Sequence, residues 1–86
     1  MTAQQAVARG AQMYLPHRGD PTGATPQLFY RWTPTKCNDG TVHVGLEYLS
    51  HCDLWQGSNI STKAEQLTFA RDRLIPIPGA QQVDPE

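Results

Sequence analysis

Residues 36–55, KCNDGTVHVGLEYLSHCDLW, contain both cysteines and two of the three histidines of the chain. Cysteine thiolates and histidine nitrogens are common zinc ligands, and two thiols can also form a disulfide. The order of these residues, C-x5-H-x7-H-C, matches no standard zinc pattern. Whether the side chains can converge therefore depends on the elements that carry them.

Those elements are predicted to form a β-hairpin. Residues 27–36 and 41–49 are rich in β-branched and aromatic residues, and the residues between them, Asn38-Asp39-Gly40, are a strong turn signal. We expect a three-residue loop, in which a type I turn is followed by Gly40 in the left-handed region. On one face this register pairs apolar residues, namely Trp32 with Leu46, Tyr30 with Tyr48 and Pro34 with Val44.

The hairpin separates the two cysteines. Cys37 lies beside the turn, whereas Cys52 follows the far end of the second strand. Eight residues of strand place these ends about 26 Å apart, and disulfide Cα atoms must lie within about 7 Å. We therefore expect two reduced thiols and no metal or other cofactor.

The other face of the hairpin is the better candidate for a binding site. Gly45 has no side chain, so it leaves a gap between the side chains of its strand. The predicted result is a small polar hollow that could hold a polar ligand, lined by Arg31, Thr33, Thr35, His43 and Glu47. The alternative is a solvated sheet face with one cross-strand ion pair, since one face of an antiparallel sheet is commonly wet.

Helices are predicted on both sides of the hairpin. Residues 2–15 carry apolar residues at helical spacing behind a possible cap, Thr2. Residues 62–74 begin with Thr62 and Glu65, which fit a capping box. We expect an α+β fold with a small antiparallel sheet, made of the hairpin 27–36/41–49 and a short third strand, packed by two helices. If residues 62–74 are a strand instead, the alternative is a small SH3-like β-barrel.

The predicted domain covers residues 1–78, and residues 79–86 are predicted to be a flexible tail because they are polar. Residues 16–26 hold three prolines and two glycines, which predicts a loop. Pro34 lacks an amide hydrogen, so we expect residues 28–36 to be an edge strand. The expected contact surfaces are this edge, through Phe29 and Pro34, and the region of Trp55.

Composition limits the function. The net charge is -1 and the chain has no run of about 18 apolar residues, so a nucleic-acid or membrane role is not favoured. Residues 1–15 lack the apolar centre of a signal peptide, and we expect a cytoplasmic location. No nucleophile motif, phosphate loop or zinc-hydrolase motif is present, so an enzyme is not favoured.

The first hypothesis is a non-enzymatic protein-interaction module that self-associates or binds a host protein, as small accessory proteins of phages and other mobile elements do. It rests on a small core, because a domain of 86 residues buries a low fraction of its surface. The second hypothesis is a small-molecule binder or modest enzyme that uses the polar hollow. The third is a single-stranded nucleic-acid binder that uses four residues, namely Phe29, Arg31, Arg71 and Arg73.

Overall fold

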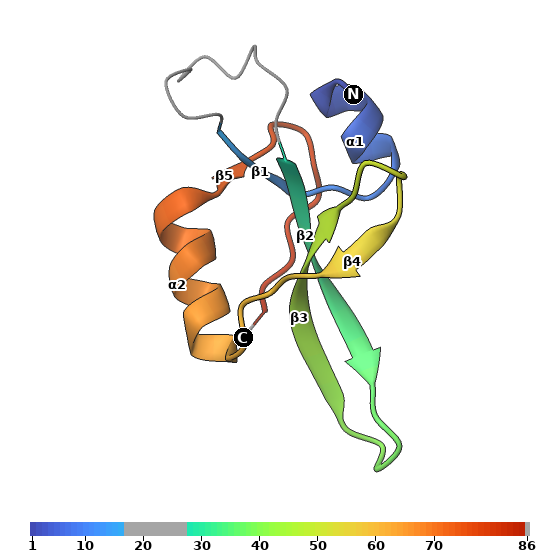
Figure 1. The fold of residues 1–86 in the computed structure, drawn as a ribbon, viewed down its shortest axis with the longest axis vertical. Helices are drawn as coiled ribbons and strands as arrows, with labels where there is room; N and C mark the ends of the chain where they lie inside the picture. Colours follow the sequence, from blue (N-terminus) through green and yellow to red (C-terminus); the bar gives the residue numbers. More distant parts are fainter. Residues whose placement is uncertain (17–27, 86) are drawn as a thin grey trace.

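The computed structural model describes residues 1–16 and 28–85. Within these residues the chain forms an antiparallel sheet of five strands, in the order β4-β3-β2-β1-β5, and two helices (Figure 1). The elements are α1 (Ala3–Ala8), β1 (Met13–Leu15), β2 (Leu28–Lys36), β3 (Val42–Leu49), β4 (Trp55–Gly57), α2 (Lys63–Arg73) and β5 (Ile75–Pro76). The mixed helix and sheet fold is confirmed. Gln27, where the predicted hairpin begins, and the predicted loop after Pro16 lie outside the described residues.

The predicted register of the hairpin is confirmed. Trp32 pairs with Leu46, and Thr35 pairs with His43. Gly40 has a φ of 87°, and its amide donates to the Cys37 carbonyl at 3.0 Å, which closes the type I turn. A side chain at Gly40 would be strained in this left-handed conformation.

The sheet is larger than predicted and is not closed. The two strands that sequence reasoning missed, β1 and β5, add to the far side of β2, so the sheet ends at β4 and β5, which do not pair. The SH3-like barrel is therefore not supported. Residues 63–73 are a helix, and the Thr62 hydroxyl accepts a hydrogen bond from the Glu65 amide at 3.1 Å, as the capping pattern predicts.

The first predicted helix is shorter than expected because Gly10 ends it. Gly10 has a φ of 97°, and its amide donates to the Val7 carbonyl at 2.9 Å. The Ala11 amide donates to the Ala6 carbonyl, also at 2.9 Å. These two bonds form a Schellman motif, the common helix ending that places glycine in the left-handed region. The chain then turns away and continues as β1.

The prediction that β2 is an edge strand is wrong for its first half. Residues 28–30 pair with β1, and Tyr30 also pairs with Tyr48 of β3, so β2 lies between these two strands in the sheet. Pairing with β1 ends at Tyr30. On the side of β2 that faces β1, no described strand pairs with residues 31–36. Pro34 lies in this second half, which is where a residue without an amide hydrogen is tolerated.

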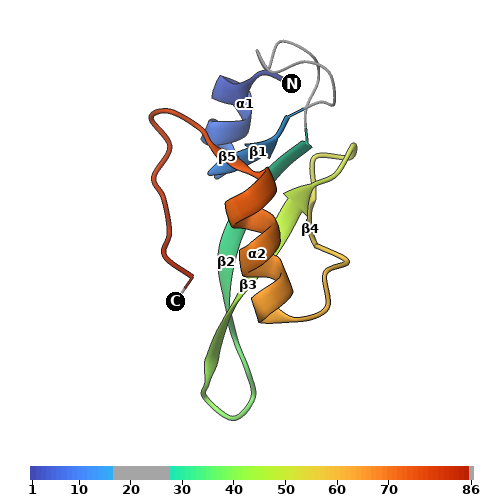
Figure 2. The same ribbon diagram turned by 90° about the vertical axis from the view of Figure 1, so that its left-hand side faces the viewer.

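The two faces of the sheet carry two hydrophobic clusters. On the face towards α2 the buried residues are Met13, Tyr30, Trp32, Leu46 and Leu74. On the face towards α1 they are Ala6, Ala11, Phe29, Leu49 and Ile77. Figure 2 shows α2 lying across the sheet, with α1 at the end opposite the hairpin turn. No residue of α2 is fully buried, so this helix covers its face loosely.

The prediction that Phe29 faces outward is wrong. Its side chain is 5% exposed and packs with Ala6 of α1 and with Ile77. The sequence pattern assigned Phe29 to a wet face, but α1 and the segment after β5 cover one end of that face. Phe29 is therefore part of the core and offers no surface to a partner.

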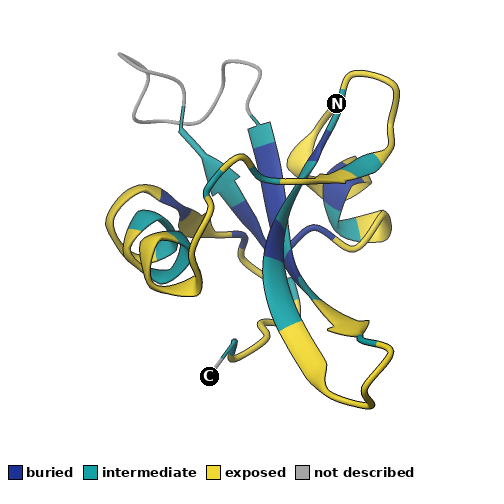
Figure 3. Cartoon of the chain, turned by 60° about the horizontal axis from the view of Figure 1, so that its bottom comes forward, coloured by how far each residue is buried: buried dark blue, intermediate teal, exposed yellow. Residues whose placement is uncertain are grey.

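The far half of the hairpin extends beyond the body. We call residues 33–45 the hairpin arm. β1 ends its pairing at Tyr30, and β4 pairs only with the stretch from Glu47 to Leu49, so no described strand flanks the arm on either side. Most of the arm is exposed, as Figure 3 shows in yellow, and the molecule measures 43 × 24 × 23 Å. A two-stranded ribbon alone is marginally stable in water.

The segment after Pro78 contacts the body at several points. Ala80 packs against the cluster beneath α1, and the Gln82 amide side chain donates to the Gln12 carbonyl at 2.9 Å. Lys63 donates to the Pro85 carbonyl at 2.8 Å. The flexibility of this tail stays a prediction. No helix in the described ranges combines the length and the apolar character that crossing a bilayer requires.

Candidate functional site

The structure divides the predicted polar hollow into two groups of residues. The first group, which we call the clamp, consists of Arg31, Thr33, Glu47 and Trp55. One carboxylate oxygen of Glu47 accepts from the Thr33 hydroxyl at 2.7 Å and from Arg31 Nε at 3.1 Å. Cross-strand pairing brings these side chains together, as predicted, because Arg31 lies opposite Glu47 and Thr33 is the next residue on that face.

Trp55 connects the clamp to α1. The Arg31 guanidinium lies 4.2 Å from the centroid of the Trp55 ring, in cation–π contact. The indole N–H donates to the Arg9 carbonyl at 3.0 Å, and Arg9 pairs with Asp53. The Arg31 and Glu47 side chains are each 27% exposed, and the clamp is connected to the end of α1 through Trp55.

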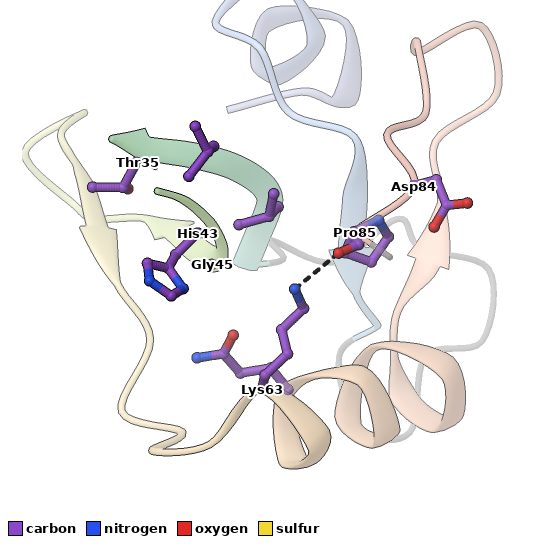
Figure 4. Close-up of a pocket in the computed structure, with 9 residues that line it drawn as sticks. Thr35, His43, Gly45, Lys63, Asp84 and Pro85 are labelled. Atoms are coloured by element: carbon purple, nitrogen blue, oxygen red, sulfur yellow. Dashed lines mark hydrogen bonds between the residues drawn. The ribbon is translucent and has the colours of Figure 1, made fainter. Parts of the chain in front are cut away.

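The second group lines a cleft between the hairpin arm and the start of α2. Thr35, His43 and Gly45 lie on the arm, and Gly45 has open space where a side chain would stand. The cleft has a volume of about 620 Å³, and its other lining residues are Val42, Val44, Lys63, Gln66, Asp84 and Pro85. Figure 4 shows His43 approaching from the hairpin and Lys63 from the helix.

One wall of the cleft is the free edge of β3. The Leu46 carbonyl accepts from the Ser58 amide at 3.1 Å, and the Leu46 amide reaches the Gln66 side chain at 3.4 Å. Alternate residues of a strand direct their backbone groups to the same side. The N–H and C=O of Val44 and Val42 therefore point to the side that β4 leaves open.

The free edge of β2 is different. The Trp32 amide donates to the Gln12 side-chain oxygen at 3.0 Å on the side where β1 has ended. By the same alternation the Pro34 nitrogen points to that side, and it carries no hydrogen to donate. The edge of β2 thus offers fewer hydrogen bonds to an added strand than the edge of β3.

Both cysteines are free. Cys37 is half-buried beside the turn, and its amide donates to the Thr41 carbonyl at 2.8 Å. Cys52 is exposed in the loop between β3 and β4. In the parts of the chain that the structure describes, histidine, cysteine and acidic side chains do not gather in a group of three or more that could hold a metal ion.

Sequence reasoning missed Gln12, Lys63 and Gln66. Gln12 and Gln66 each use a side-chain oxygen to accept a strand amide where no neighbouring strand continues. No local sequence pattern marks such a role, because it depends on where another strand stops. Lys63 is the first residue of α2, a position that the capping pattern does locate.

Residues proposed for nucleic-acid binding take part in other contacts. Phe29 is buried, Arg31 belongs to the clamp, and the Arg73 guanidinium lies 5.5 Å from the Phe69 ring centroid. A stacking surface needs an exposed ring beside free cations. This arrangement does not supply one at Phe29.

Comparison with known proteins gives no relative on which to base a function. The sequence matches no protein-family model, and neither a curated protein nor a solved structure matches the chain.

Proposed function

We propose that this chain is a non-enzymatic protein-interaction module that binds through its hairpin arm, either to a second copy of itself or to a host protein. The observation that carries the proposal is the arm itself, a two-stranded ribbon with both edges free of described strands. Free edges are templates for pairing with another chain. An added strand would also supply the neighbours that a lone ribbon lacks.

The apolar side of the arm supports the same proposal. Val42 is 60% exposed, Pro34 is exposed and Val44 is half-buried. The register places these three residues on one face, the face that α2 covers only farther along the sheet. An exposed apolar surface on a projecting element is typical of an interaction site.

The test compares two variants with equal exposure at the changed residue. Val42→Glu adds a charge to the arm, and Leu54→Glu adds the same charge to the loop before β4, where the leucine is 61% exposed. Association is measured by light scattering at two concentrations with reductant, because Cys52 is exposed and could form an intermolecular disulfide. Binding to host proteins is measured by pull-down with the same variants.

We expect Val42→Glu to weaken the association of the full chain at least tenfold and Leu54→Glu to leave it unchanged. Both variants should unfold at the same urea concentration as the unaltered chain, because both residues are exposed. Equal effects of the two variants on association, or no effect of Val42→Glu, would remove the arm as the binding surface.

A second candidate function is the binding of a small polar ligand in the cleft. Its volume of about 620 Å³ falls in the range of small-molecule sites, and His43, Lys63 and Gln66 supply polar groups. Titration with citrate or inorganic phosphate, followed by the amide NMR signals of Gly45 and Lys63, tests this function. Saturable shifts below millimolar concentration would support it, and their absence would exclude these anions.

A further inference from the structure

We infer that a pocket between α2 and the sheet binds a small apolar molecule of one or two rings, such as indole. Figure 2 shows α2 lying across the face of the sheet on which this pocket is found. Among the described residues, the pocket shares only Pro85 with the cleft at the hairpin arm. The inference goes beyond the proposed function, because the arm takes no part in it. Three features support it: the walls, the fit of α2 and the volume.

The walls of the pocket are mainly apolar. The lining residues from the sheet, from α2 and from the end of that helix are Met13, Trp32, Leu67, Ala70 and Leu74. Arg71 also lines the pocket, but this residue is exposed, and the aliphatic stem of an arginine can cover an apolar wall. Apolar walls offer water no hydrogen-bond partners. An apolar ligand can therefore displace water from them at little cost.

The fit of α2 on the sheet leaves this space open. Leu67 and Ala70 lie three residues apart, on the side of the helix that packs against the cluster around Trp32, yet both are only partly buried. Ala70 contributes a single methyl group, so its side chain fills little of the space beside it. A ligand in the pocket would bury apolar surface that α2 leaves exposed, and such burial is the main driving force for apolar binding.

The volume of the pocket sets the size of the ligand. It is about 260 Å³, and an apolar cavity of about 150 Å³ in another protein is large enough to bind benzene. The pocket therefore has room for one ring or for two fused rings. Aromatic rings and thioether sulfur atoms both make favourable contacts with a bound ring. Trp32 and Met13 supply these groups, so an aromatic compound is the appropriate probe.

The test uses the full chain and two compounds, indole and purine, which are fused ring systems of the same size but differ in polarity. Binding is followed by the amide NMR signals of the labelled protein. Ala70→Leu fills the pocket with a larger side chain. Ala64→Leu makes the same change at an exposed residue of α2 that does not line the pocket. Urea unfolding of both variants verifies that each is folded.

We expect saturable shifts at Leu67, Ala70 and Leu74 with indole, and a dissociation constant of about 1 mM or lower. Purine should bind at least about tenfold more weakly, because its ring nitrogens would lose their hydrogen bonds to water. Ala70→Leu should weaken indole binding at least about fivefold, since the added side chain occupies the site, and Ala64→Leu should bind indole as the unaltered chain does.

Equal affinities for indole and purine, or no saturable shift at millimolar indole, would overturn the inference. Equal binding of indole by the two folded variants would do the same. Indole shifts confined to His43 and Gly45 would place the ligand in the cleft and would also contradict it. The comparison of the two compounds needs only the unaltered chain, so it decides the matter even if Ala70→Leu does not fold.

Discussion

Replacement of Trp55 by alanine separates two roles for this residue, a surface anchor for a partner or a contact that holds the fold together. The structure supports the second role. Trp55 is half-buried against the cluster beneath α1, stacks on Arg31 and donates to the Arg9 carbonyl. A fully buried tryptophan costs about 3–5 kcal/mol when truncated to alanine. Trp55 is half-buried, so we take half of that value and add about 1 kcal/mol for the lost hydrogen bond. The free energy of unfolding should therefore fall by about 2–4 kcal/mol.

That loss is large for a domain of 86 residues, whose total stability is expected to be about 4–13 kcal/mol. Urea unfolding measures it directly, and the melting temperature should fall by about 10–25 °C. Trp55→Phe is the matched control, since it keeps a ring beside Arg31 but cannot donate to Arg9, and it should cost about 1 kcal/mol. An alanine variant with stability within about 0.5 kcal/mol of the unaltered chain and weakened association would refute this reasoning.

Three further predictions follow from the backbone and the core. Gln12→Leu should destabilise the chain by about 1–3 kcal/mol and speed hydrogen exchange at the Trp32 amide, which loses its acceptor in a buried site; unchanged exchange at that amide would contradict this. Gly40→Ala should lower the free energy of unfolding by about 1–2 kcal/mol because Gly40 has a positive φ. Gly45→Ala should change the stability in urea little, since the added side chain meets open space, and equal losses for the two variants would contradict the turn assignment. Burial raises the pKa of the Tyr30 hydroxyl, and the nearby Arg73 partly opposes this shift. The folded state therefore holds the Tyr30 proton more tightly than the unfolded state does. The free energy of unfolding should fall as the pH rises above about 10, and Tyr30→Phe should reduce this fall.

The hairpin was predictable because its determinants are local. The turn residues and the alternation of apolar side chains around Trp32 and Leu46 define one register, and a shift by one residue would reverse both faces. The start of α2 was predictable for the same reason, since Thr62 and Glu65 are three residues apart. The end of α1 carried a readable signal as well, because Gly10 is the residue type that closes a Schellman motif.

The parts that sequence reasoning missed depend on contacts between distant segments. Phe29 is buried because α1 happens to cover its end of the sheet, and no pattern within the strand reveals that cover. The predicted pairing of Arg31 with Glu47 across the hairpin is confirmed. The contact of Arg31 with the Trp55 ring, and the bond from Trp55 to the Arg9 carbonyl at the end of α1, were not predicted. His43 is left with a cleft whose other wall, at Lys63, comes from a segment 20 residues later.

In the association proposed for the arm, the proline at position 34 would limit the size of the assembly. A ribbon with two equivalent edges can accept a strand on each side, and repeated addition then builds an open-ended filament. Here the edge of β2 has lost a donor at Pro34, whereas the edge of β3 keeps its donors at Val42 and Val44. Addition at one edge ends growth after a single step. If the arm binds as proposed, we expect finite complexes, and a chain with alanine at position 34 would be the form at risk of fibre formation.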